Sequence, residues 1–201
     1  PARAEAPAAM VAAVDTEARQ VFVNPQVAWT WETMQFVIAH ELLHVGLRHE
    51  ARRQGRDPFL WNVACDYVIN GWLVQMGVGT MPPGCLLDID AALERESAEA
   101  LYDRIASDLR LRRRLAKART FGCPGRGDIL GDRPPAWWHG AGCDLDEFYR
   151  RALAEGLELH GARCGGRGLL PGSLVEEIRS LSQPPIPWDV ALGQWLDDFF
   201  P

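Results

Sequence analysis

The chain has 201 residues, of which 47% are hydrophobic and 24% are charged. This composition is typical of a globular protein and excludes an intrinsically disordered chain. No apolar run reaches the roughly 18 residues that a membrane span requires. The 27 acidic and 21 basic residues give a net charge of −6, which argues against a surface that binds nucleic acid over its whole extent.

The five cysteines predict a reducing compartment. They are Cys65, Cys85, Cys123, Cys143 and Cys164. An odd number without a C-x-x-C pair makes a poor disulfide framework. Because no charged-then-apolar signal segment opens the chain, we expect a cytoplasmic protein, or a piece of one. The last three cysteines match no zinc-finger spacing, so we expect small core residues there.

The chain begins with a predicted β-hairpin. Short apolar runs at 10–14 and 20–23 flank a polar stretch at 15–19, a pattern typical of two strands joined by a turn. Pro25 ends the second strand, because proline has no N–H to donate to a sheet.

Two apolar helices are predicted next. The first covers residues 30–54, and its residues 36–47 are apolar around nearly the whole circumference, which indicates a buried helix. A second helix begins at Asp57, an N-cap acceptor that is followed by Pro58 at the first helical position. It is predicted to end at Gly77, and a loop follows over 77–87.

The remainder of the chain carries weaker signals. They predict one or two helices over 97–117, a long ordered loop over 120–143, and helices over 144–160, 172–182 and 188–199. A loop of that length is usually functional or mobile. The arginine-rich stretch 104–119 is typical of a solvated helix face, or of a surface for an acidic partner. The apolar side of 188–199 either docks on its own core or meets a partner.

The chemistry concentrates at His40, Glu41 and His44. Histidines four residues apart project from one face of a helix, and two such imidazoles can ligate one zinc ion at about 2.0–2.1 Å. Glu41 lies to the side of the pair, where it can act as a general base on a metal-bound water. Burying three ionisable groups costs several kcal/mol unless something compensates them. We therefore predict one Zn²⁺ ion.

A catalytic zinc site needs a third protein ligand and an open position. Asp66 lies on the second predicted helix between Asn62 and Asn70, and the three form a polar stripe on an apolar helix. A polar stripe that faces a core needs partners. Asp66 is therefore the predicted third ligand, with both amides orienting ligands. A solvent-facing stripe is the alternative.

His49 is the alternative third ligand. It lies five residues after His44 and faces away from the His40–His44 side of a straight helix. It could ligate the ion only if the helix broke at Gly46. Otherwise we expect a helix-end histidine, or one that supports a ligand.

These residues carry a family resemblance. Residues 23–25, 36–53 and 57–79 closely resemble the metallopeptidase domain of bacterial VWA-associated proteins, which is broadly of the zincin type. The resemblance is close over 10–105 and loose beyond. It implies a mainly helical α+β, zincin-like fold with a small N-terminal β-hairpin or sheet packed on the active-site helix. It also implies a VWA-like domain downstream of the 201 residues and a MoxR-type ATPase partner.

We accordingly expect residues 1–201 to form one metallopeptidase-like domain, with a metal-site core at 10–90 and a helical, loop-rich remainder at 91–201. The predicted activity is zinc-dependent hydrolysis of a peptide bond in a peptide or protein. Glu41 takes a proton from the metal-bound water and passes it to the leaving amine.

Two residues are candidates for stabilising the oxyanion, Tyr67 and His139, and packing is the alternative role for both. Two other functions compete with a peptidase. One is a non-catalytic zinc-binding module that acts with a VWA-type domain and an ATPase. The other is an adaptor that uses the arginine-rich stretch. Neither nucleic acid nor a membrane is an expected partner.

Overall fold

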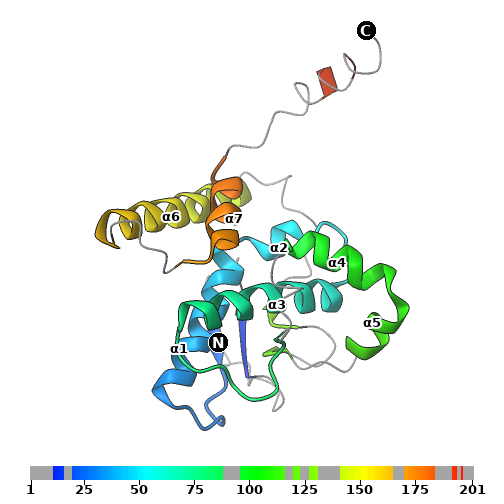
Figure 1. Ribbon diagram of the computed structural model, residues 1–201, viewed down its shortest axis with the longest axis vertical. Helices are drawn as coiled ribbons and strands as arrows, with labels where there is room; N and C mark the ends of the chain where they lie inside the picture. The colour runs from blue at the N-terminus through cyan, green and yellow to red at the C-terminus, as the bar shows by residue number, and fades with distance from the viewer. Residues whose placement is uncertain are drawn as a thin grey trace.

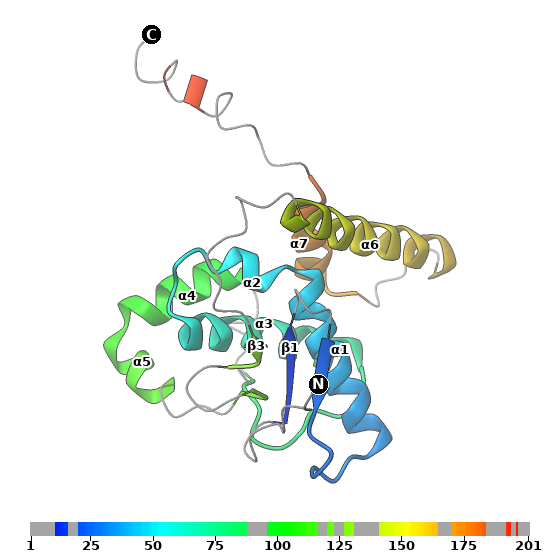
Figure 2. The same cartoon turned by 180° about the vertical axis from the view of Figure 1, so that it is seen from behind.

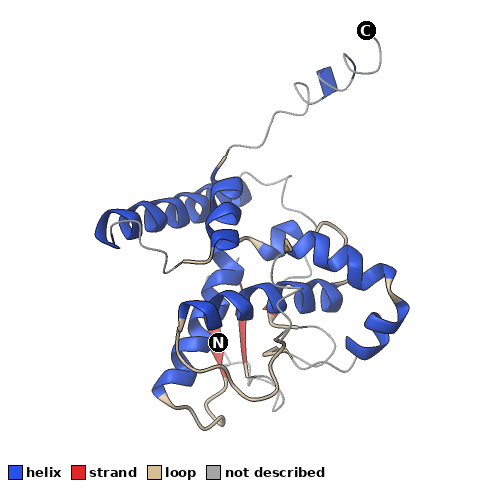
Figure 3. Ribbon diagram, in the orientation of Figure 1, coloured by secondary structure: helices blue, strands red, loops and turns tan. Residues whose placement is uncertain are grey.

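The structure is a computed structural model. It describes residues 11–15, 20–87, 96–115, 120–122, 127–130, 141–164, 170–183, 192–193 and 196. Its elements in chain order are β1 (Ala12–Asp15), β2 (Gln20–Val23), α1 (Trp31–Gly46), α2 (His49–Arg52), α3 (Pro58–Met76), α4 (Ala98–Ser107), α5 (Leu109–Leu115), β3 (Ile129–Leu130), α6 (Ala141–Cys164) and α7 (Gly172–Ser182). Helices predominate around one small sheet (Figures 1 and 3), which confirms the mainly helical α+β class.

The sheet has the strand order β2-β1-β3. The predicted hairpin is confirmed: β1 and β2 pair antiparallel, with Ala12 opposite Val23. On its other edge β1 pairs in parallel with β3, so that Val14 lies opposite Ile129. Figure 2 shows β3 beside β1 and close to α3. This parallel pairing brings Asp128, the residue before β3, to His40 of α1 and Asn62 of α3. The prediction of an uninterrupted loop over 120–143 was therefore wrong at 129–130, and also at 141–143, where α6 has begun.

The helix predicted over 30–54 is interrupted. α1 ends at Gly46, and Arg48 has φ +59° before α2 begins. Tertiary contacts fix the new direction: the Trp61 indole donates to the His49 carbonyl at 2.7 Å, and the Arg52 guanidinium donates to the Leu47 carbonyl at 3.1 Å. Contacts of this kind override the helical propensity of residues 50–53.

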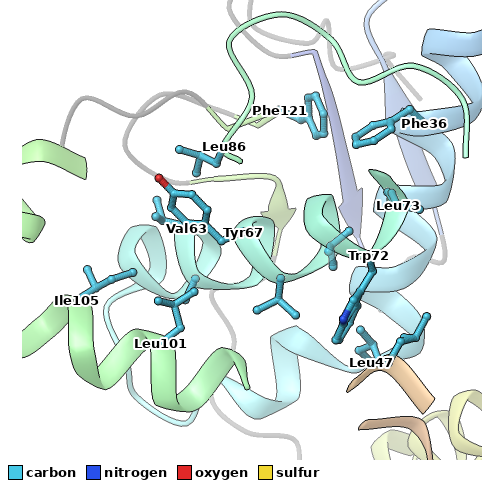
Figure 4. Close-up of a cluster of buried hydrophobic side chains, with 14 of the residues drawn as sticks. Phe36, Leu47, Val63, Tyr67, Trp72, Leu73, Leu86, Leu101, Ile105 and Phe121 are labelled. Atoms are coloured by element: carbon cyan, nitrogen blue, oxygen red, sulfur yellow. The ribbon is translucent and has the colours of Figure 1, made fainter. Parts of the chain in front are cut away.

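α3 begins and ends where the sequence predicts. The Asp57 side chain accepts from the Leu60 N–H at 2.8 Å, and Gly77 ends the helix with φ +65°. A left-handed backbone conformation at this position favours glycine. The helix is buried along most of its length and packs against α1 and α4. Figure 4 shows apolar side chains on both sides of it, including Phe36, Phe121 and Leu101.

The remaining helices surround this core. α6 and α7 pack together, and α6 also contacts α1. Arg52 binds Glu99 through two hydrogen bonds of 2.9 and 2.8 Å, and it also pairs with Glu177. One guanidinium thereby joins α2, α4 and α7.

Several expectations fall outside the described residues. The predicted helix over 188–199 lies mostly outside the described residues, and so do His139 and Cys123. Within the described part of the chain, none of the helices combines the length and apolarity that crossing a membrane requires.

Candidate metal centre

Four buried side chains converge between α1, α3 and the start of β3. His40 and His44 come from α1, Asp66 from α3, and Asp128 from the residue before Ile129. None of the four is more than 2% exposed. One nitrogen or oxygen from each lies within 4.8 Å of the others. The predicted ligands His40, His44 and Asp66 are therefore brought together, and a second carboxylate joins them.

The separations suit a small tetrahedral cation. Ligand atoms that bind zinc at its usual distances lie about 3.3–3.6 Å from one another. Asp66 Oδ1 lies 3.6 Å from His40 Nε2 and 3.3 Å from His44 Nε2. The Asp128 oxygens lie 3.4 and 3.7 Å from the same two nitrogens. The two Nε2 atoms are closer, at 2.9 Å.

Asn70 sets the orientation of His40. His40 Nδ1 lies 2.9 Å from Asn70 Oδ1, and the amide nitrogen of Asn70 donates to the Leu86 carbonyl at 2.9 Å. Because the amide oxygen can only accept, Nδ1 carries the hydrogen of this bond. A neutral His40 ring therefore presents the lone pair of Nε2 to the cluster.

His49 supports His44 from the opposite side of the ring. The chain turn at Arg48 brings His49 Nδ1 to 3.0 Å from His44 Nδ1, whereas Asp66 faces Nε2. Burial lowers the pKa of His49 well below its usual value, so this ring is neutral and can accept a hydrogen bond. His49 thus lies where it can orient a ligand, as one of the two sequence expectations had it, and away from the paired Nε2 atoms.

Asn62 links the carboxylate of Asp66 to the backbone of Asp128. Its amide nitrogen donates to Asp66 Oδ1 at 3.1 Å, while its oxygen accepts from the backbone N–H groups of Asp128 at 3.2 Å and Ile129 at 3.4 Å. The approach is so close that a Cβ on Gly127, which has φ +87°, would lie 2.4 Å from Asn62 Cγ. Glycine is therefore required at position 127.

Two buried carboxylates at the cluster lack hydrogen bonds. Within the described residues, neither carboxylate oxygen of Glu41 or of Asp128 has a hydrogen-bond partner, and both side chains are fully buried. Burial raises the pKa of Glu41 well above its usual value, with Asp128 adding to the effect. Burial also lowers the pKa of His40, but Asp128 and Asp66 outweigh it and raise that pKa to about 10.

The charge and the donor atoms of the cluster fit a metal ion. Buried carboxylates cost several kcal/mol unless they are compensated, and a protonated His40 supplies one positive charge to the two aspartates. A divalent cation would compensate both. Two imidazoles with carboxylate oxygens are a donor set that zinc accepts, and magnesium and calcium prefer oxygen alone. The residues present therefore fit a bound ion of the zinc type.

The other sequence candidates lie elsewhere or outside the description. Tyr67 is 8% exposed and packs in the apolar core of Figure 4. His139 is not among the described residues. Sequence reasoning missed Asp128, since no periodic pattern surrounds it. The available signal was its place in a glycine-rich stretch too long for a simple connection.

Fold and site together define a mainly helical domain with a buried histidine–aspartate centre suited to a metal ion. The family described as "Putative metallopeptidase domain" matches residues 2–200, so the chain belongs to that family. Neither the curated proteins nor the solved structures gave a match.

Proposed function

We propose that this domain hydrolyses peptide bonds with one zinc ion held by His40, His44 and Asp66. The observation that carries the proposal is Glu41, a fully buried carboxylate without a hydrogen-bond partner among the described residues, on the same helix as the two histidines. Membership of the metallopeptidase family supports the same reaction.

In the proposed mechanism the ion, when bound, would lower the pKa of a water and polarise the scissile carbonyl. Glu41 accepts the proton of that water at a carboxylate oxygen and delivers it to the leaving amine. A carboxylate with a raised pKa is suited to hold the proton between these two steps.

The neighbouring residues position the ligands. Asn70 fixes the His40 ring, His49 contacts Nδ1 of His44, and Asn62 donates to Asp66. Such supporting hydrogen bonds orient metal ligands and raise their basicity. Tyr67 and His139 remain the candidates for stabilising the oxyanion. A zincin-like relationship, a VWA-like domain downstream and a MoxR-type ATPase partner are parts of the same proposal.

The test compares Glu41→Gln with Glu32→Gln, an exposed glutamate on the same helix. Both zinc-loaded variants and the wild type are incubated with a peptide mixture, and cleavage is followed by mass spectrometry. We expect Glu41→Gln to retain zinc and to lose roughly 10²–10⁴-fold in rate, the usual contribution of a general base. Glu32→Gln should match the wild type. Undiminished cleavage by the Glu41→Gln protein would contradict the mechanism.

A second candidate function is a non-catalytic zinc-binding module. One observation favours it: Asp128 gives the centre four candidate protein ligands, and a structural zinc site is closed by four. The two candidates differ in whether a water or an inhibitor can reach the ion.

A further inference from the structure

Asp128 faces the same two nitrogens as Asp66. Its Oδ2 lies 3.4 Å from His40 Nε2, and its Oδ1 lies 3.7 Å from His44 Nε2. These separations are close to the 3.6 and 3.3 Å that Asp66 makes with the same atoms. Asp66 approaches both nitrogens with its Oδ1, and Asp128 approaches each with a different oxygen. Both carboxylates are therefore close enough to bind an ion between the rings.

The ion-pair contacts of the Asp128 side chain are with the same two histidines. It is fully buried, and within the described residues neither of its oxygens has a hydrogen-bond partner. A buried carboxylate that only filled space would be strongly unfavourable. A cation between His40 and His44 would satisfy it.

The backbone around Asp128 is fixed on both sides. The Phe121 carbonyl accepts from the N–H groups of Val11 and Ala12 at 2.7 and 3.1 Å, which attaches the preceding segment to the sheet. The Asp128 carbonyl accepts from the Val14 N–H at 2.9 Å. Together with the close packing of Gly127 on Asn62, these bonds hold the carboxylate toward the histidines.

Asn62 makes this arrangement specific. One amide donates to Asp66 and accepts from the backbone of Asp128, so a single side chain sets the spacing of the two acids. Asp66 on α3 and the β3 segment (residues 127–130) are therefore positioned together.

We propose that Asp128 is a fourth protein ligand of the ion, and that the described conformation is a closed form of the centre. Two imidazoles and two carboxylates fill a tetrahedral set, which leaves no position for a water or a substrate. The inference rests on the proposed metal site and names how that site is regulated: Asp128 must leave the ion before Glu41 has a water to act on, so wild-type cleavage comes from the small fraction of molecules that are open at any time.

The experiment uses the full chain, stripped of metal and then loaded with Co²⁺ or Zn²⁺. It compares the wild type with Asp128→Asn, Asp128→Ala and the control Asp103→Asn, which removes an exposed carboxylate of α4. Visible absorption of the Co²⁺ protein is recorded during an azide titration, and Zn²⁺ affinity is measured by competition with a chromophoric chelator. Circular dichroism checks the fold of each variant.

We expect azide to leave the wild-type and Asp103→Asn spectra unchanged and to shift the Asp128→Ala spectrum, because only that variant has a vacant position. Asp128→Asn should bind Zn²⁺ at least tenfold more weakly than Asp103→Asn. Two results would overturn the proposal: a wild-type spectrum that shifts with azide, or equal Zn²⁺ affinities for Asp128→Asn and Asp103→Asn. If Asp128→Ala does not fold, the other two comparisons still decide.

The outcome is separable from that of the proposed function, since neither readout involves peptide cleavage. A centre that opens in Asp128→Ala but cleaves no peptide would support the closed form and count against the peptidase. A wild-type centre already open to azide would overturn the closed form and leave the Glu41→Gln test intact.

Discussion

The candidate centre is built from two kinds of structure. His40 and His44 lie four residues apart on α1, and Asp66 lies four residues from Asn62 and from Asn70 on α3, so the faces on which they lie follow from the sequence. Asp128 lies in a short extended segment that reaches the histidines through parallel pairing with β1. The comparison teaches that helices supply ligands which pattern can identify, whereas a ligand brought by strand pairing depends on tertiary structure alone.

The largest expected effect tests the β3 segment directly. Gly127→Ala would place a methyl group against Asn62 at a residue with φ +87°. We expect it to lower the free energy of unfolding by about 3 kcal/mol, from overpacking and backbone strain together. Gly55→Ala is the matched control, since Gly55 has φ +80° and nothing within 4 Å of the added Cβ. Urea denaturation of both variants measures the difference, and equal losses would show that the close approach to Asn62 is unimportant.

A smaller effect is expected on the helical side of the centre. Asn70→Ala removes the acceptor that holds His40 Nδ1. Loss of such a supporting bond typically lowers metal affinity about 10–100-fold. Competition with a chelator measures the change, and Gln75→Ala, a substitution on the exposed side of the same helix, serves as control. An affinity within twofold of that control would mean that α3 positions the histidine without this hydrogen bond.

The smallest expected effect is the change in zinc affinity for each unit of pH. In the metal-free protein Asp128 and Asp66 outweigh burial and raise the pKa of His40 to about 10, so this ring is protonated at pH 7. Zinc binds the neutral ring, so binding displaces one proton. Below that pKa, the apparent zinc affinity therefore rises about tenfold for each unit by which the pH is increased. Calorimetry in buffers of different ionisation enthalpy should detect proton release at pH 7. Binding without proton release would show that His40 is already neutral.

Capping residues and apolar runs in the sequence predict several helix and strand boundaries. The capping residue Asp57 and the stop at Gly77 locate α3 to the residue, and the apolar runs locate the hairpin. The break after Gly46 is not predicted, because the following residues favour a helix and hydrogen bonds to Trp61 of α3 and Glu99 of α4 redirect them. That same break determines where His49 lies, so its side chain could not be placed from spacing alone.

Complete burial of His40, His44, Asp66 and Asp128 has a kinetic consequence. An ion held among these side chains would be shielded from solvent in the described conformation, so we expect it to exchange when part of the fold opens. We expect the opening at β3, a two-residue edge strand that pairs with β1 alone. The half-life of the bound ion would then measure the rate at which this segment opens.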